Sequence, residues 1–179
     1  LAIPELRDLM QASDVLAIGP GLTAAEETAA LVREIVSSTP LPVVLDADGL
    51  NAFAGRSAEL KGEKRVMILT PHPAEMARLM SRPDSPPVTS AQVQADRVGA
   101  ARDFARQHSC YLVLKGHRTA VAEPGGQVWI NPSGNPGMAS AGSGDVLTGV
   151  LVGLLGQGLS PIDACLLGVY VHGLAGDIA

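Results

Sequence analysis

Residues 135–149 read NPGMASAGSGDVLTG, a segment rich in glycine and other small residues directly before an apolar helical pattern. Glycine lets the backbone approach a ligand closely and adopt positive φ, and a helix N-terminus offers unpaired N–H groups with partial positive charge. The N–H groups of Gly142, Ser143 and Gly144 are therefore expected to converge on an anion such as a phosphate. Asp145 would stand in the first helical turn, where it either complements the helix dipole or takes a proton from an attacking hydroxyl.

The rest of the chain alternates short apolar runs with longer helical patterns, which is typical of βα units around a mainly parallel sheet. Four of these runs are apolar throughout, as expected of strands that are covered on both faces. They lie at residues 14–19, 42–47, 66–70 and 110–116. Two further runs, at 119–123 and 127–131, are separated by a Pro-Gly-Gly turn and predict a C-terminal antiparallel hairpin. The pattern as a whole predicts an α/β fold.

Helix boundaries are also signalled locally. Thr23 with Glu26 three residues later predicts a capping box, and Ser160 followed by proline predicts the start of another helix. One continuous helix is expected from about residue 90 to 108, because apolar side chains recur there at near-helical spacing. Residues 81–90 are rich in proline and serine and predict a surface loop.

Composition and charge favour one domain that binds a small ligand. The 179 residues, 46% of them hydrophobic, suffice for one sizeable core, so we expect a single domain over residues 1–179. A formal net charge of -5 without a cluster of Lys and Arg argues against nucleic acid and membrane surfaces as partners. Cys110 and Cys165 lie in apolar segments and indicate buried thiols, and no signal peptide or membrane span is recognisable. We therefore expect a reducing, cytoplasmic location.

Unusual sequences follow four of the expected strands, at the edge of the sheet where ligands sit in α/β folds. GPGL at 19–22 lets the backbone turn tightly and expose N–H groups, although a purely structural turn would look the same. In VVLDADGLN at 43–51, the carboxylates of Asp46 and Asp48 either hold Mg²⁺ through water or cap the next helix. Asp46 is the better candidate for a ligand role, because it comes directly off the strand.

The third and fourth strands are followed by TPHPAEM and KGHRT. His72 is held extended between two prolines and could hydrogen-bond a substrate, while Glu75 either orients a metal-bound water or favours the positive helix terminus. Lys115 ends its strand and can meet a phosphate as a point charge, although strand-end lysines are often simply solvated. Three other polar residues read as surface or packing groups, namely His117, His172 and Asp177.

These motifs carry a resemblance to known proteins. GSGD inside NPGMASAGSGD resembles the signature of the ribokinase-like superfamily. GPGL, LDADGLN, TPHPAEM, KGHRT and NPGMASAGSGD, in this order, resemble the ADP-dependent NAD(P)H-hydrate dehydratase family over nearly all of the chain. The resemblance implies a ribokinase-like three-layer α/β/α fold from which the N-terminal part is missing. The chain also begins and ends inside helical patterns and lacks an initiator methionine, so we expect truncation at both ends.

The same resemblance implies an activity. The family repairs hydrated NADH and NADPH by phosphorylating the added hydroxyl and expelling phosphate, with ADP (or ATP) as donor and Mg²⁺ implied by the phosphoryl transfer. Asp145 would deprotonate the substrate hydroxyl, and Gly21 and His72 would contact the hydrated dinucleotide together with it. The adenine nucleotide would be bound by Lys115, Gly116, His117, Arg118, Thr119, Gly142, Ser143 and Gly144. The candidate metal ligands are Asp46 and Glu75.

Some features leave alternatives open. Ala74 stands where the family pattern HPGE has glycine, which could alter the turn after His72. A ribokinase-like kinase of a small alcohol or vitamin precursor would release a stable phosphorylated product. A nucleotide-binding module would bind ADP or AMP without turnover. A homo-oligomer and a fused or partner epimerase domain are further expectations.

Overall fold

A computed structural model describes residues 2–179 of the chain. Within these residues, six strands form one sheet in the order β1-β2-β3-β4-β5-β6. The strands are β1 (Leu16–Ile18), β2 (Val43–Leu45), β3 (Met67–Leu69), β4 (Tyr111–Leu114), β5 (Ala120–Ala122) and β6 (Val128–Ile130). β1 to β4 run parallel, and β5 pairs antiparallel with both β4 and β6. Each strand lies inside a run expected from the sequence, so the mainly parallel sheet and its C-terminal hairpin are confirmed.

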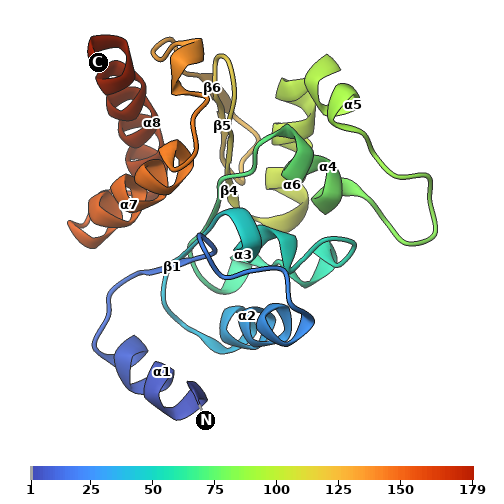
Figure 1. The fold of residues 1–179 in the computed structure, drawn as a ribbon, viewed down its shortest axis with the longest axis vertical. Coiled ribbons are helices and arrows are strands. Elements are labelled where there is room, and N and C mark those ends of the chain that lie inside the picture. Colours follow the sequence, from blue (N-terminus) through green and yellow to red (C-terminus); the bar gives the residue numbers. More distant parts are fainter. Residues whose placement is uncertain (1) are drawn as a thin grey trace.

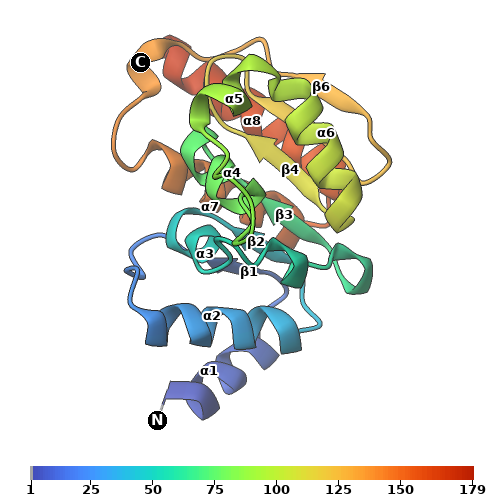
Figure 2. The same cartoon turned by 90° about the vertical axis from the view of Figure 1, so that its right-hand side faces the viewer.

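Helices cover both faces of this sheet. The α-helices are α1 (Ala2–Gln11), α2 (Glu26–Ser38), α3 (Ala47–Asn51), α4 (Pro73–Met80), α5 (Ser90–Ala95), α6 (Arg97–His108), α7 (Ser143–Gly156) and α8 (Pro161–Ile178). Short 3₁₀ helices are η1 (Ser57–Glu59), η2 (Gly62–Lys64) and η3 (Pro136–Met138). Figures 1 and 2 show α7 and α8 on one face of the sheet, with α2, α3, α4 and α6 on the other. The predicted three-layer α/β/α arrangement is confirmed.

The side chains of the central strands belong to two separate hydrophobic cores, because successive side chains of a strand point to opposite faces of the sheet. In β2, Val43 and Leu45 pack toward α2 and α4, whereas Val44 packs against Leu147 and Leu151 of α7. All three β2 residues are fully buried. This explains why the strand is apolar at every position instead of alternating with polar residues.

Both cysteines are free and buried, as expected from the sequence. Burial raises the pKa of the Cys110 thiol to about 12, so this group stays protonated and unreactive. Among the residues that the structure describes, none of the helices has both the length and the hydropathy needed to cross a membrane.

The predicted helix over residues 90–108 is in fact two helices. Asp96 leaves the helical conformation at φ −141° and ψ 74°, and its carboxylate accepts a hydrogen bond from the Gly99 N–H at 2.8 Å as the cap of α6. Thr89 and Gln92 form a capping box for α5. The apolar periodicity continues across the break, which is why spacing alone missed it. Residues 81–89 form the predicted surface loop, without helix or strand.

The capping box expected at Thr23 is wrong. α2 begins three residues later, behind Ala25, which gives it no side-chain cap. Thr23 instead takes positive φ, and its N–H donates to the Asp48 carboxylate at 2.9 Å. The cap expected at Ser160 is confirmed, because its hydroxyl accepts a hydrogen bond from the Asp163 N–H at 3.2 Å.

Hydrogen bonds beyond the strand ends bring the polar motifs together. The Asp46 N–H donates to Ile18 at 3.1 Å, and the Thr70 N–H donates to Leu45 at 3.0 Å. The Lys115 N–H donates to the Pro71 carbonyl at 2.9 Å. The segments that follow β1 to β4 therefore emerge side by side at one edge of the sheet.

Candidate active site

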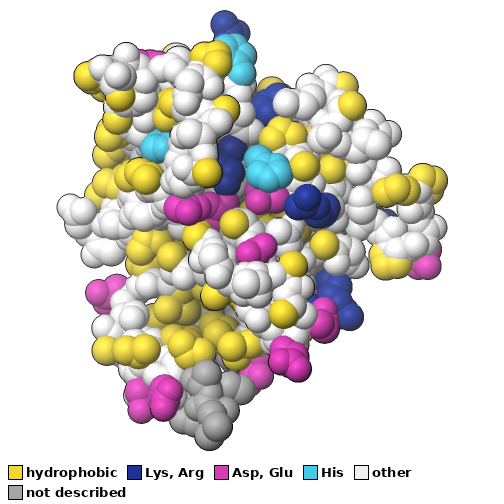
Figure 3. Space-filling view, in the orientation of Figure 1, with side chains coloured by type: hydrophobic (Ala, Val, Ile, Leu, Met, Phe, Trp, Pro, Cys, Tyr) yellow, Lys and Arg dark blue, Asp and Glu magenta, His cyan; other side chains and the backbone are white. Residues whose placement is uncertain are grey.

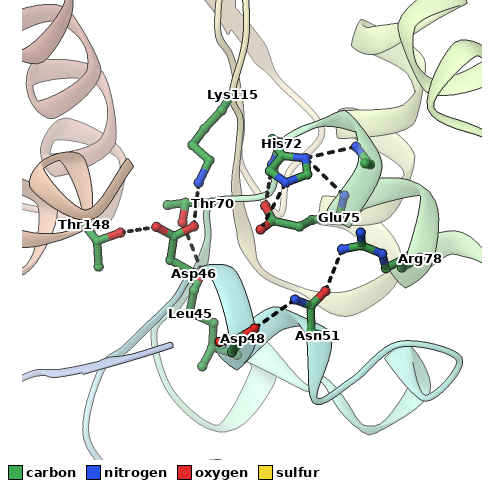
Figure 4. A network of polar contacts seen from close by, with 11 residues as sticks. Leu45, Asp46, Asp48, Asn51, Thr70, His72, Glu75, Arg78, Lys115 and Thr148 are labelled. Atoms are coloured by element: carbon green, nitrogen blue, oxygen red, sulfur yellow. Dashed lines mark hydrogen bonds and ion pairs between the residues drawn. The ribbon is translucent and has the colours of Figure 1, made fainter. Parts of the chain in front are cut away.

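A buried ion pair lies at this edge, between the ends of β2 and β4 (Figure 4). The Asp46 Oδ1 accepts a hydrogen bond from the Lys115 ammonium at 2.5 Å, and the Oδ2 accepts one from the Thr148 hydroxyl at 2.8 Å. The Asp46 side chain is 1% exposed and that of Lys115 is 19% exposed. Asp46 makes no capping bond to α3, and Lys115 is not simply solvated, so both of these alternatives are wrong.

The Asp46 carboxyl is held in its ionised form. Burial by itself raises the pKa of the Asp46 carboxyl, because water is removed from the charged form. The charge of Lys115 and the hydrogen bonds from Lys115, Thr148 and Thr70 outweigh burial, so the pKa of Asp46 lies below its ordinary value. Asp46 is therefore a carboxylate at neutral pH.

The N-terminus of α7 adjoins this ion pair. Gly142, at φ +87°, precedes the helix and gives it no side-chain cap. A Cβ placed on Gly144 would lie 3.1 Å from the Lys115 Nζ and 3.6 Å from the Asp46 Oδ2. The bare backbone of the glycine-rich loop is therefore in close contact with the ammonium and the carboxylate.

Some N–H groups of this first turn are free. The Ser143 N–H donates to the Ser140 carbonyl at 3.3 Å, which differs from the expected convergence of three successive N–H groups. Within residues 2–179, the N–H groups of Gly144 and Asp145 have no hydrogen-bond partner. A helix N-terminus of this kind, beside an ammonium, suits an anion.

Asp145 stands at the third position of α7 with its side chain exposed. Its carboxylate makes no hydrogen bond or ion pair with the other residues that the structure describes. A carboxylate beside an anion site can accept the proton of an attacking hydroxyl. Its role as a base stays a prediction, which the accessibility of the group permits.

One histidine at this corner was not expected from the sequence. His172 of α8 places its Nε2 3.4 Å from the Oγ of Ser143. Burial lowers the pKa of His172, a hydrogen bond with the Ser143 backbone partly opposes this, and the charge of Lys115 lowers the pKa further. The neutral ring can fix the orientation of the Ser143 hydroxyl. The contact exists because α7 packs along α8, and no local pattern in α8 signals it.

The segment before the glycine-rich loop is tied to the end of α8. The Asp177 carboxylate accepts hydrogen bonds from the Gly134 N–H at 2.8 Å and from the Asn135 amide at 3.1 Å. Asn135 also donates to the Gly176 carbonyl at 2.6 Å. Asp177 is thus a surface polar group, one of the two predicted alternatives, and it anchors the loop that leads to α7.

His72 and Glu75 form a capping box at the start of α4 (Figure 4). The His72 Nδ1 accepts hydrogen bonds from the Ala74 and Glu75 N–H groups at 3.1 and 3.3 Å. The Glu75 Oε2 accepts the His72 N–H at 2.8 Å, and the Oε1 lies 3.3 Å from the His72 Nε2. Ala74 takes part through its N–H, so replacing the glycine of HPGE leaves this turn intact. The His72 side chain is 47% exposed, which leaves it accessible to a ligand.

The two glycines of GPGL have different surroundings. Gly19 is buried at φ +143°, and a Cβ on it would overlap the Asp46 carbonyl oxygen. A Cβ on Gly49 would in turn overlap the Ile18 carbonyl, so the ends of β1 and β2 approach each other backbone to backbone. Gly21, at φ +77°, is exposed and has no heavy atom within 4 Å of a Cβ. Gly19 therefore serves packing, and Gly21 is free to meet a ligand.

The loop between β4 and β5 carries the KGHRT segment. Gly116 adopts φ +138°, and the Thr119 hydroxyl donates to the Gly116 carbonyl at 3.2 Å. His117 and Arg118 are exposed. Lys115 contacts the buried carboxylate, and the other residues of the segment lie on the surface of the same edge.

The candidate site lies on an open face of the molecule. Figure 3 shows acidic, basic and histidine side chains meeting near the middle of this face, between the α7 side and α4. A separate hollow of about 570 Å³ lies between the 81–88 loop and α6, and none of the predicted site residues lines it. We call the N-terminus of α7 together with the Lys115–Asp46 pair the anion corner. It is distinct from that hollow.

The expected metal ligands already have protein partners. Both oxygens of Asp46 and both of Glu75 contact hydrogen-bond donors of the chain. Among the described residues, no group of three or more His, Cys, Asp and Glu side chains could hold a metal ion. Coordination of Mg²⁺ by Asp46 and Glu75 stays a prediction.

The chain is similar to proteins of established name. The family model described as NAD(P)H-hydrate dehydratase matches residues 3–179. A bifunctional NAD(P)H-hydrate repair enzyme Nnr of Moorella thermoacetica is 51% identical over 178 residues, which cover 99% of this chain and 32% of that protein. An ADP-dependent (S)-NAD(P)H-hydrate dehydratase of Neisseria meningitidis serogroup B is 43% identical, over 90% of this chain and 52% of that protein. The chain thus spans about a third to about a half of these relatives.

Solved structures agree with this relationship. An ADP/ATP-dependent NAD(P)H-hydrate dehydratase of Bacillus subtilis, co-crystallised with ATP and Mg²⁺, has a TM-score of 0.79 and 37% identity, covering 92% of this chain and 55% of that one. A ribokinase-like superfamily protein of Enterococcus faecalis has a TM-score of 0.80 and 26% identity, covering 98% of this chain and 59% of that one. The expected ribokinase-like fold is confirmed. On sequence and fold together, the chain belongs to the NAD(P)H-hydrate dehydratase family.

Proposed function

We propose that the full-length protein dehydrates hydrated NADH and NADPH in a nucleotide-dependent reaction, with ADP as the phosphoryl donor. The observation that carries this proposal is the open N-terminus of α7 against the Lys115–Asp46 pair, with the exposed Asp145 in its first turn. Such a corner suits a phosphoryl group in transfer to a hydroxyl. The choice of substrate and donor is supported by the names of the relatives.

Two chemical steps would complete the reaction. In the first, Asp145 accepts the proton of the substrate hydroxyl, the oxygen forms a bond to the terminal phosphorus of ADP, and AMP leaves. The Gly144 N–H and the Lys115 ammonium stabilise the charge on the transferred group. In the second, the carbon–oxygen bond breaks, phosphate leaves with its electron pair, and the neighbouring ring carbon loses a proton. The dihydronicotinamide double bond is thereby restored.

The remaining residues bind the two ligands. Gly21 and His72 contact the hydrated dinucleotide, and both are accessible to it. The nucleotide is bound by Lys115, Gly116, His117, Arg118, Thr119, Gly142, Ser143 and Gly144. The nucleotide would bring Mg²⁺ to the site, and that ion would supply positive charge to neutralise the phosphates.

The test is a turnover assay on the full-length protein. Hydrated NADH is mixed with ADP and Mg²⁺, and the return of dihydronicotinamide absorbance is followed. Asp145→Asn should lower turnover by about 100-fold or more, because it removes a base and keeps the shape. Nucleotide affinity should stay nearly unchanged in this variant. Unchanged turnover would rule out the base role of Asp145.

A matched control is available in the same fold. Asp163 occupies the third position of α8 as Asp145 does in α7, but it lies beside its own cap, Ser160. Asp163→Asn should retain normal turnover. If nucleotide is consumed with small alcohols and the hydrate is untouched, the protein is a kinase. Tight nucleotide binding without any turnover identifies a binding module instead.

Other expectations about the whole protein belong with this proposal. A single domain over residues 1–179, a cytoplasmic location, a homo-oligomer and a fused or partner epimerase domain stay predictions. The name "bifunctional" of several relatives supports a second activity in the same polypeptide. Size-exclusion chromatography and an epimerisation assay on the full-length protein test the last two.

A further inference from the structure

We infer that Asp46 is a positioning residue, which holds the Lys115 ammonium at the N-terminus of α7 so that it meets the nucleotide phosphates. This inference rests on nucleotide binding at the proposed site. It does not depend on which hydroxyl compound is phosphorylated there. In this inference Asp46 acts through Lys115, in place of the metal-ligand role expected from the sequence.

Asp46 is itself fixed from two directions. Its backbone N–H continues the sheet by donating to Ile18 at 3.1 Å, so the residue is held at the end of β2. Its Oδ2 accepts the Thr148 hydroxyl at 2.8 Å, and Thr148 is buried in α7, one turn beyond Gly144. The carboxylate thus ties the sheet to the helix whose N-terminus forms the anion corner. A carboxylate held in this way has little freedom to rearrange.

Lys115 is fixed at both of its ends. The guanidinium of Arg97, the first residue of α6, donates to the Leu114 carbonyl at 2.8 Å and to the Lys115 carbonyl at 3.3 Å. The ammonium is bound by Asp46 at 2.5 Å. A lysine stem is flexible and loses much rotamer freedom on being ordered. Because the Lys115 side chain is already ordered in the free protein, a ligand does not have to order it on binding, and the ammonium is preorganised.

The charges explain why a carboxylate is needed here. The positive end of α7 and the Lys115 ammonium lie close together and repel each other. Asp46 compensates this repulsion in the absence of nucleotide. Within residues 2–179 the ammonium has no second hydrogen-bond partner, so its remaining N–H groups can bond a phosphate while it stays on Asp46.

The experiment measures ADP affinity with EDTA and again with Mg²⁺, by titration calorimetry on the full-length protein. Asp46→Asn should weaken Mg²⁺-free ADP binding by roughly tenfold or more, since the neutral amide oxygen lacks the charge that holds the ammonium in place. Lys115→Met should have an effect of similar size. The double variant should be no weaker than Lys115→Met alone, because Asp46 acts only through that lysine.

Two further variants keep the test interpretable if Asp46→Asn folds poorly. Thr148→Val removes one bond to Asp46 and leaves the ion pair, so it should weaken Mg²⁺-free ADP binding to a smaller extent. Asp48→Asn is the matched control, because this nearby carboxylate binds Thr23 and Asn51 and should leave ADP affinity unchanged. Melting temperatures of all variants report on folding separately.

Three results would overturn the inference. If Asp46→Asn loses affinity only when Mg²⁺ is present, Asp46 is a metal ligand. If the effects of Asp46→Asn and Lys115→Met add, the two residues act independently. If the wild-type protein binds no ADP, both the positioning role of Asp46 and the proposed dependence of the reaction on ADP are wrong. If ADP binds and the variants behave as expected but the hydrate is not turned over, only the proposed substrate is contradicted and the role of Asp46 is supported.

Discussion

Replacing Gly19 by alanine is expected to destabilise the fold far more than the same change at Gly21. Gly19 has φ +143°, and a Cβ there would overlap the Asp46 carbonyl oxygen. The backbone strain alone costs about 1–3 kcal/mol, and the overlap with main-chain atoms must move the end of β2 as well. Gly21 has φ +77° and open space around a Cβ, so its alanine variant carries only the left-handed cost of about 1–2 kcal/mol.

The assay is urea unfolding of both variants, with the free energy of unfolding obtained by linear extrapolation. The free energy of unfolding should fall by at least about 2 kcal/mol more in Gly19→Ala than in Gly21→Ala. A difference of this size is typical of a disruptive substitution in a protein core. For a chain of this size, the melting temperature should fall by about 4–8 °C more. Equal losses in the two variants would refute the argument that the close approach of β1 and β2 requires glycine at position 19.

Three other predictions test the packing and the charges. Gly144→Ala should weaken nucleotide binding in a titration with little change in melting temperature, because its Cβ would lie 3.1 Å from the Lys115 Nζ, a side-chain atom that can shift without moving the backbone. Ser160→Ala removes the cap of α8 and should cost about 1 kcal/mol in urea unfolding, while turnover stays normal. Burial lowers the pKa of His108 and of His172 in the folded state, so the unfolded chain binds more protons as pH falls below about 6.5. Stability should therefore be lower at pH 5 than at pH 7, and His108→Gln should reduce this difference if the reasoning is right.

Much of the fold could be predicted from the sequence because its signals are local. β2 reads as three consecutive apolar residues, which is what burial on both faces requires. The Pro-Gly-Gly turn marks the hairpin of β5 and β6, and Ser160 with the following proline marks the start of α8. The glycine-rich segment before α7 likewise predicts an exposed helix N-terminus, because Gly142 can adopt the positive φ that is needed there.

Local signals gave wrong predictions at one helix break and at one helix start. The periodicity over 90–108 continues through Asp96, so only the structure shows that the chain turns there and begins a second helix. Thr23 has the sequence of a cap, but the carboxylate of Asp48 binds its N–H and holds it outside α2. In both cases a hydrogen bond from a backbone N–H to a side-chain carboxylate outweighed a weak helical preference.

The sequence by itself determined which segments meet, because parallel strands carry their C-terminal motifs to one edge of the sheet. Only the tertiary structure decided how those residues pair. Asp46 and Lys115 are 69 positions apart, and Thr148 is 102 positions from Asp46. No periodicity or spacing encodes such contacts, which depend on the order of the strands in the sheet and on the packing of α7 against it. Burial and geometry in the folded chain therefore decide that Asp46 pairs with Lys115 and does not cap α3.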